Sequence, residues 1–285
     1  MSSRKFITLL TIVGVRYASA HGDLHQQIAS ISAQIEKEPG NAELYLQRGE
    51  MHRLHVEFPE AAADFAKAAE FRPEWPQATL AKARLALSEG KFENAIEEMD
   101  RLLSKHPEYP EGWLIRARAR NQKKDHLGAA KDYTEIVRRM ERPEPEIYLE
   151  RASALAAAGE DRCEEALRGL EEGVAKLGPV TTLNLAALDL ELRMKHFEKA
   201  LLRVDHLASA ARRRESWFAR RGDILLQLER TEEARAAYRE ALDAITALPS
   251  QHQLAPATVE LQSRVTAALA KLEAVGPRRG DVPSP

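Results

Sequence analysis

The chain has 285 residues, of which 44% are hydrophobic, 30% are charged and 6% are aromatic. Its 42 basic and 44 acidic side chains leave a net charge of −2, which argues against a nucleic-acid-binding surface or a polyanionic tail. Few aromatic residues, with 14 Gly and 14 Pro, argue against an all-β or disordered chain, and a single cysteine excludes an internal disulfide.

Residues 1–20 have the pattern of a cleaved secretory signal peptide. The basic residues Arg4 and Lys5 precede an apolar run over 6–15, and Ala18 and Ala20 stand where a signal peptidase reads the chain. The run is too short for a membrane span, which needs about 20 apolar residues. We therefore predict export, to a periplasm or outside the cell, with no stable membrane span after cleavage.

The rest of the chain repeats with a period close to 34 residues. An alanine recurs at this interval, with one step of 37, and a bulky apolar residue follows each alanine at the fourth position. A small residue such as Gly49 or Gly222 precedes most of these alanines by twelve positions. The alanines are Ala61, Ala95, Ala129, Ala166, Ala200 and Ala234, and the bulky residues are Phe65, Met99, Tyr133, Leu170, Val204 and Tyr238. Each unit therefore reads as two helices that approach closely at the small residue, such as 76–89 and 92–104.

These residues resemble the tetratricopeptide repeat (TPR) family over about residues 24–248. The first unit matches the family pattern at Tyr45, Arg48-Gly49, Ala61, Phe65, Ala68 and Pro73, and the third matches at Trp113, Arg116-Ala117, Ala129, Tyr133 and Ile136. The resemblance implies an all-α, right-handed α-solenoid of about six TPR helix pairs.

The predicted domain organisation places the six TPR units over 41–248. A half-repeat cap over 21–40 precedes them, a capping helix follows over 249–275, and a disordered tail occupies 276–285. The fourth unit carries two extra residues, which predict a lengthened turn near 159–163. The fifth unit has Leu188 where a small residue is expected, so we predict irregular packing there.

Basic residues of the first helices stand sixteen positions before acidic residues of the second helices. The pairs are Arg48 with Asp64, Lys82 with Glu98, and Arg116 with Asp132. One interpretation is a basic ligand-binding stripe, and the other, which the constant offset favours, is an ion pair inside each repeat. Arg151 and Arg221 lack the matching acid, so we expect them to contact other groups.

No catalytic motif is present, so the sequence predicts neither an enzyme nor a cofactor. His52 and His55 are three residues apart and could share a metal, but they fall at packing positions, and we interpret them as structural. Cys163 is interpreted as a packing residue at a helix start. His21 would begin the mature chain, where its amine and imidazole could chelate copper. An exported copper-binding protein is therefore the alternative function.

The resemblance implies that the first helices of the repeats line a concave groove for a ligand. The groove residues that it implies are Glu43, Leu46, Glu50, Gln77, Leu80, Arg84, Glu111, Leu114, Arg118, Asn121 and Leu149. If the leucines contact a ligand they should be partly exposed, with Arg84 and Arg118 projecting beside them. The alternative is that the leucines pack between neighbouring helices. The predicted function is an exported, non-enzymatic and monomeric scaffold that binds a protein or peptide partner but no nucleic acid.

Overall fold

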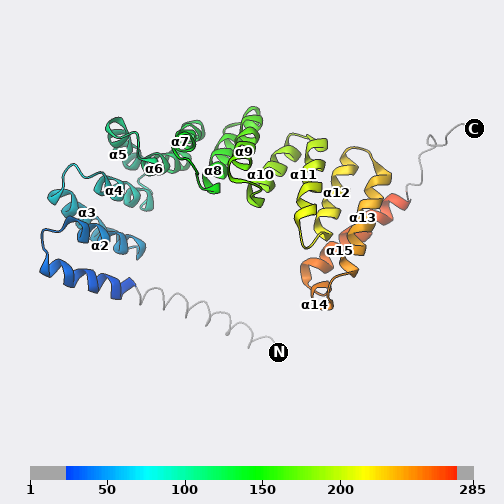
Figure 1. Cartoon of the computed structure of the whole chain (residues 1–285), viewed down its shortest axis with the longest axis horizontal. Coiled ribbons are helices and arrows are strands. Elements are labelled where there is room, and N and C mark those ends of the chain that lie inside the picture. The colour runs from blue at the N-terminus through cyan, green and yellow to red at the C-terminus, as the bar shows by residue number, and fades with distance from the viewer. Residues whose placement is uncertain (1–23, 275–285) are drawn as a thin grey trace, which may run out of the picture. The chain divides into compact units, whose positions relative to one another are not determined.

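The computed structural model describes residues 24–274, which form helices and contain no strand (Figure 1). The all-α fold class is therefore confirmed for this part of the chain. None of its helices combines the length and the apolar character that crossing a membrane requires. The predictions for the signal peptide, for His21 and for the tail over 276–285 fall outside the described residues.

The helices belong to two compact units, Met1–Pro143 and Glu144–Pro285, here called the N-terminal and C-terminal units. In the N-terminal unit, helical residues 24–37 precede α2 (Ala42–Leu54), α3 (Phe58–Phe71), α4 (Pro76–Ser88), α5 (Phe92–Lys105), α6 (Pro110–Gln122) and α7 (His126–Arg139). The C-terminal unit contains α8 (Pro145–Ala158), the 3₁₀ helix η1 (Glu160–Arg162), α9 (Cys163–Leu177), α10 (Thr181–Arg193), α11 (Phe197–Ala210), α12 (Glu215–Gln227), α13 (Thr231–Thr246), α14 (Ser250–Gln253) and α15 (Pro256–Ala274).

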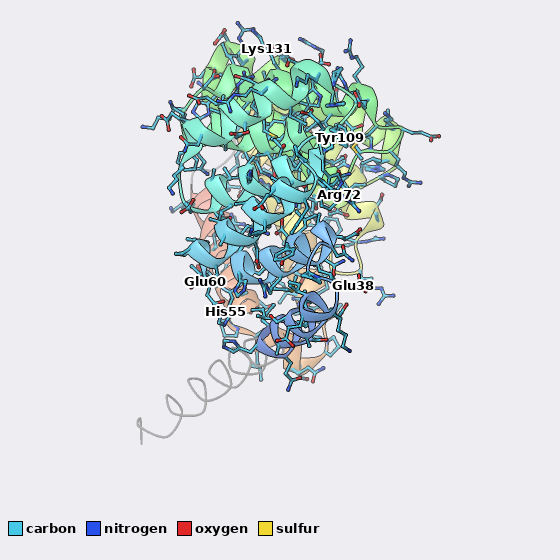
Figure 2. The ribbon with its side chains drawn as sticks, turned by 90° about the vertical axis from the view of Figure 1, so that its left-hand side faces the viewer. Glu38, His55, Glu60, Arg72, Tyr109 and Lys131 are labelled. Carbon is cyan, nitrogen blue, oxygen red and sulfur yellow. The ribbon has the colours of Figure 1, made fainter. Side chains whose placement is uncertain are left out.

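Helices that follow one another in sequence pack together as the repeat predicts. The pairs α2–α3, α4–α5 and α6–α7 form hairpins in the N-terminal unit, and α8–α9, α10–α11 and α12–α13 do so in the C-terminal unit. First helices also contact each other, α2 with α4 and α4 with α6. In Figure 2, His55 and Glu60, at the turn within the first pair, lie on one side of the ribbon, and Glu38, Arg72 and Tyr109, at turns between pairs, lie on the other.

In the first and last hairpins a glycine of the first helix faces a bulky residue of the second. A Cβ atom on Gly49 would lie 2.6 Å from Cε1 of Phe65, and a Cβ atom on Gly222 would lie 2.6 Å from Cε1 of Tyr238. In α10 and α11 the equivalent positions hold Leu188 and Val204, which are both completely buried in one core cluster. The irregular packing that we predicted at Leu188 stays a prediction.

The turn inside most hairpins contains one residue in the left-handed conformation. Val56, Gly90, Lys124, Lys195 and Glu229 have φ angles between 59° and 75°. The next residue donates a backbone hydrogen bond to the carbonyl five positions before it, as Glu57 does to His52 at 2.9 Å. This is the hydrogen bond that ends a helix in a Schellman motif. The motif directs the chain into the second helix, and only one of the five positions is a glycine.

The fourth hairpin differs at its turn, as predicted. The 3₁₀ helix η1 occupies the extra residues between α8 and α9. Cys163 follows it as the first residue of α9 and is 1% exposed, which agrees with a packing role.

The terminal helices of the described chain bury apolar side chains. Ile35 of the first helix is buried, and Leu24, Ile28 and Ile31 are half-buried. Val265 and Leu269 of α15 are buried where α15 contacts α12 and α13. The short helix α14 before α15 was not predicted.

Candidate functional site

The first helices α2, α4 and α6 present one side of the N-terminal unit, here called the first-helix face. Leu46 and Leu114 are half-buried on it, as a contact surface requires. Leu80 is only 2% exposed, so it follows the alternative in which the leucines pack between helices. It belongs to a core cluster with Met99 and Leu103 of α5 and Ile115 of α6. The leucines thus divide between the two roles that the sequence left open.

Most of the other predicted groove residues lie on α2, α4 and α6, and one lies in the C-terminal unit. Glu43 and Arg118 are exposed, and Glu50, Gln77, Arg84, Glu111 and Asn121 are half-buried. Asn121 Oδ1 lies 2.7 Å from His126 Nδ1, so this side chain joins α6 to α7. Leu149 is half-buried on α8 in the C-terminal unit.

Arg84 links the first helices through two ion pairs. Its Nη2 lies 2.6 Å from Glu50 Oε1 on α2, and its Nη1 pairs with Glu111 on α6. No acid of its own repeat pairs with Arg84, as expected. Acidic residues of the two neighbouring repeats reach it instead. The row Glu50–Arg84–Glu111 therefore places alternating charges on the first-helix face.

The predicted ion pairs inside the repeats form in two of the three cases. Arg48 Nη2 lies 2.7 Å from Asp64 Oδ1, and Arg116 Nη2 lies 2.8 Å from Asp132 Oδ1. The hydrogen bond to Asp64 raises the pKa of the Arg48 guanidinium above its usual value.

Lys82 makes no ion pair with Glu98, so the third predicted pair is wrong. Glu98 instead pairs with Arg101, one turn away on α5, at 3.0 Å. Glu98 pairs with Arg101 because both residues lie on α5, so their ion pair needs no contact between helices.

Arg151 and Arg221 contact other acids, as expected. Arg151 Nη2 lies 2.6 Å from Glu172 Oε2 and also donates to the carbonyl of Gly169 at 3.1 Å. Arg221 Nε lies 3.1 Å from Asp205 Oδ1. These arginines therefore contribute to the framework of the repeats and do not form a ligand-binding stripe.

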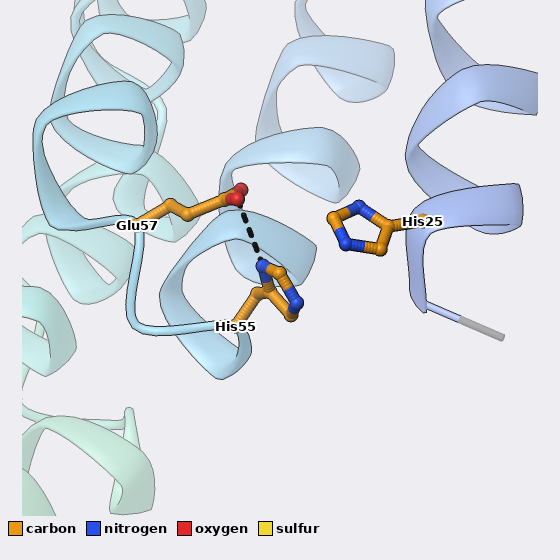
Figure 3. Close-up of side chains that lie close together, drawn as sticks. All are labelled: His25, His55 and Glu57. Atoms are coloured by element: carbon orange, nitrogen blue, oxygen red, sulfur yellow. Dashed lines mark ion pairs between the residues drawn. The ribbon is translucent and has the colours of Figure 1, made fainter. Parts of the chain in front are cut away.

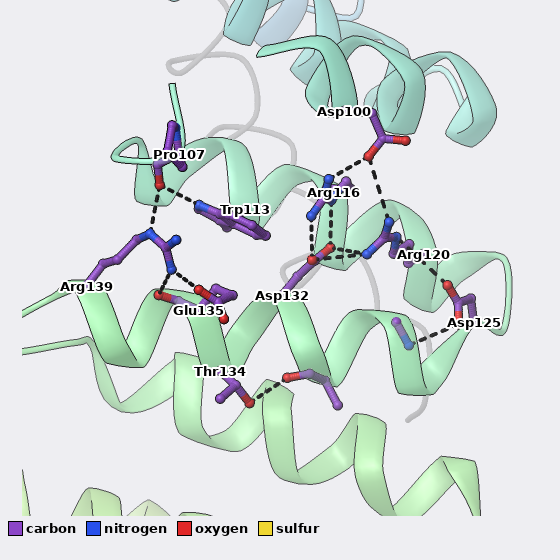
Figure 4. A network of polar contacts seen from close by, with 12 residues as sticks. Asp100, Pro107, Trp113, Arg116, Arg120, Asp125, Asp132, Thr134, Glu135 and Arg139 are labelled. Atoms are coloured by element: carbon purple, nitrogen blue, oxygen red, sulfur yellow. Dashed lines mark hydrogen bonds and ion pairs between the residues drawn. The ribbon is translucent and has the colours of Figure 1, made fainter. Parts of the chain in front are cut away.

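The third repeat contains a polar network around Arg116 (Figure 4). Asp132 accepts hydrogen bonds from both Arg116 and Arg120 (Figure 4). Burial raises the pKa of the Asp132 carboxyl above its usual value, and the hydrogen bonds from Arg116 oppose that shift. The guanidinium carbons of Arg116 and Arg139 each lie 4.7 Å from the centre of the Trp113 ring, which is a cation–π distance. Arg116 also donates to Asp100 of α5 at 2.5 Å, so the network joins α5, α6 and α7.

A cluster of histidines lies at the turn between α2 and α3. His52 Nδ1 and His55 Nδ1 lie 2.6 and 2.8 Å from the two carboxylate oxygens of Glu57. The hydrogen bonds from His52 and His55 hold the pKa of Glu57 below its usual value. The ring of His25, on helical residues 24–37, lies 4.4 Å from that of His55.

Sequence reasoning considered His52 and His55 but missed His25 and Glu57. No spacing marks His25, since it meets His55 only through the packing of the first helix on the first hairpin. Glu57 follows His55 by two positions, and that spacing was the available signal.

Two family models match the chain. A model described as tetratricopeptide repeat matches residues 80–140, and one described as tetratricopeptide repeat-like domain matches residues 149–257. The chain belongs to the tetratricopeptide repeat family. A comparison with curated proteins gives no significant sequence match.

Solved structures share the fold at low sequence identity. A tetratricopeptide repeat protein from Parabacteroides merdae superposes with a TM-score of 0.51 at 19% identity, over 90% of this chain and 97% of that protein. Yeast Tom70 gives a TM-score of 0.52 at 20% identity, over 88% of this chain and 47% of Tom70. YrrB, described as a TPR protein with an unusual peptide-binding site, gives 0.50 at 17% identity, over 63% of this chain and 91% of YrrB. These similarities establish the fold.

Proposed function

We propose that the chain is an exported, non-enzymatic scaffold whose N-terminal unit binds an apolar peptide segment on the first-helix face. The observation that carries the proposal is the placement of Leu46 and Leu114 beside the charged row Glu50–Arg84–Glu111. A peptide in extended or helical form would place apolar side chains on the leucines. Its polar groups would then meet the charged row.

The fold supports this role, because TPR helices hold a rigid face that needs little rearrangement on binding. Leu80 lies in the core cluster that joins α4, α5 and α6. A rigid surface lowers the entropy cost of binding a flexible peptide. YrrB, with the same fold, is described as having a peptide-binding site.

The experiment is a peptide-library selection on the full chain, followed by affinity measurements with the selected peptide. We expect Leu114→Glu and Arg84→Glu each to weaken binding about tenfold or more, as central contacts of an interface do. The matched control is Leu127→Glu, which changes a 43% exposed leucine on the second helix α7 of the same unit. If wild type, Leu114→Glu and Arg84→Glu bound the peptide with equal affinity, the result would contradict the proposal.

Export has a separate test. The pattern over 1–20 supports cleavage after Ala20. N-terminal sequencing of the protein from its native cells should find a chain that begins at His21. Sedimentation of that mature protein should give the mass of a monomer. A purified chain that retains residues 1–20 would contradict export.

A further inference from the structure

We propose that His25, His55 and Glu57 form a binding site for a divalent transition-metal ion such as Zn²⁺. One donor atom from each residue can be chosen so that the three atoms lie within 4.8 Å of one another (Figure 3). Among residues 24–274 this is the single group of three or more His, Cys, Asp or Glu side chains with that geometry. The site is independent of the first-helix face.

The three residues come from three different segments. His25 lies in the first turn of the helix over 24–37, His55 is the C-cap residue of α2, and Glu57 is the N-cap residue of α3. Val56 between the last two has a φ of 65°, and the turn brings His55 Nδ1 to 2.8 Å from Glu57 Oε1. In Figure 3, the His25 ring lies beside the His55 ring, across from the Glu57 carboxylate.

The donor set is one that zinc and similar ions prefer. Two imidazole nitrogens and one carboxylate oxygen are three protein ligands, and water can complete a tetrahedral site. Donors on one tetrahedral zinc ion lie about 2.0–2.2 Å from the metal and about 3.4 Å from one another, so the most distant of the three donors must move by roughly 1 Å. His25 is exposed and can rotate to do so.

His52 is placed to support the site without being one of its three ligands. Its Nδ1 lies 2.6 Å from Glu57 Oε2, the oxygen that does not face His55. Hydrogen bonds of this kind orient a metal-binding carboxylate. His52 is therefore a positioning residue.

A bound ion would cross-link the first helix to the turn of the first hairpin. Terminal helices open more readily than the centre of a fold, so a cross-link there has a measurable effect. We expect Zn²⁺ to raise the thermal midpoint of the full chain and to slow proteolysis within residues 24–37, because the ion binds the folded state.

The test is calorimetric titration of the full, metal-free chain with Zn²⁺ alone. We expect one ion per chain for wild type and a loss of affinity of about tenfold or more in His25→Ala, His55→Ala and Glu57→Gln. His52→Ala should weaken binding less than His55→Ala does. Because His25 is exposed, its substitution leaves the fold intact and keeps the test decisive even if a change at His55 impairs folding.

His106→Ala is the matched control. His106 and Glu108 have the same spacing as His55 and Glu57 and lie 3.2 Å apart, but within the described part of the chain no third ligand joins them. The control and His21→Ala should bind Zn²⁺ like wild type. No binding by wild type, or a loss in His21→Ala with none in His25→Ala, would overturn the proposal.

Discussion

Arg116 and Asp132, sixteen residues apart, form a two-point ion pair between the two helices of the third repeat. The arginine Nε and Nη2 donate to the two carboxylate oxygens at 3.0 and 2.8 Å. The Asp132 side chain is 2% exposed and that of Arg116 is 11% exposed, so both charges have lost most of their water. Such charges depend on each other, because removal of Asp132 leaves Arg116 paired with Asp100, whose side chain is 51% exposed.

We expect Asp132→Ala to lower the free energy of unfolding by about 3 kcal/mol, because Arg116 and Arg120 then face each other without the carboxylate. Urea unfolding followed by circular dichroism measures the loss. The control is Glu98→Ala, at the equivalent position of the preceding repeat. The side chain of Glu98 is 36% exposed and pairs with Arg101. This change should cost less than about 0.5 kcal/mol, and equal losses in the two variants would contradict a special role for the buried pair.

The sequence predicted the helices, the hairpins and most of the contacts that depend on a fixed offset within the repeat. Arg48–Asp64 and Arg116–Asp132 were predictable because the offset between antiparallel helices is constant. The lack of a Lys82–Glu98 ion pair was not predictable, because Arg101, which pairs with Glu98 instead, lies outside that offset.

The candidate sites were less predictable, because they depend on neighbours that no period specifies. Leu80 and Leu114 occupy the same position of their repeats, yet one is buried and the other half-buried. Their burial differs because different helices pack around Leu80 and around Leu114. His25 approaches His55 only because the first helix packs on the first hairpin, which is a contact between elements with no shared pattern.

The close approach at Gly222 gives a second prediction. A Cβ atom there would lie within 3.0 Å of three atoms of the Tyr238 ring. The ring is fixed, since Tyr238 is 1% exposed and its hydroxyl donates to Asp223 at 2.7 Å. We expect Gly222→Ala to lower the free energy of unfolding by about 1–3 kcal/mol through overpacking.

A double-mutant cycle identifies the cause. Tyr238→Val removes the ring that the added Cβ would meet, so Gly222→Ala should cost less in that background than alone. Urea unfolding of the four proteins gives the coupling. If the two changes were simply additive, the contact between Gly222 and Tyr238 would not be what limits this position.

The left-handed turn residues give a third prediction. Val56 has a φ of 65°, which is unfavourable for a β-branched residue, and its side chain is 67% exposed. Val56→Gly should therefore raise the free energy of unfolding by about 1 kcal/mol. The reverse change at the equivalent position, Gly90→Val, should lower it by a similar amount, since Gly90 has a φ of 75° and open space around it.

Thermal unfolding of the two variants against wild type measures both shifts. The control is Gly40→Ala, at a glycine without a positive φ and without atoms near its added Cβ, which should change the midpoint little. A Val56→Gly variant less stable than wild type would show that the Val56 side chain contributes packing in spite of its exposure.

The last prediction separates the two roles of the leucines on the first helices. Leu80 is 2% exposed and packs among Met99, Leu103 and Ile115, so Leu80→Glu places a charge in the core without a partner. We expect it to lower the free energy of unfolding by about 3 kcal/mol or more. Leu114 is half-buried, and a glutamate there can reach water, so Leu114→Glu should cost about 1 kcal/mol. Urea unfolding of both variants makes the comparison, and equally large losses would assign Leu114 to the core and leave the first-helix face with its charged row alone.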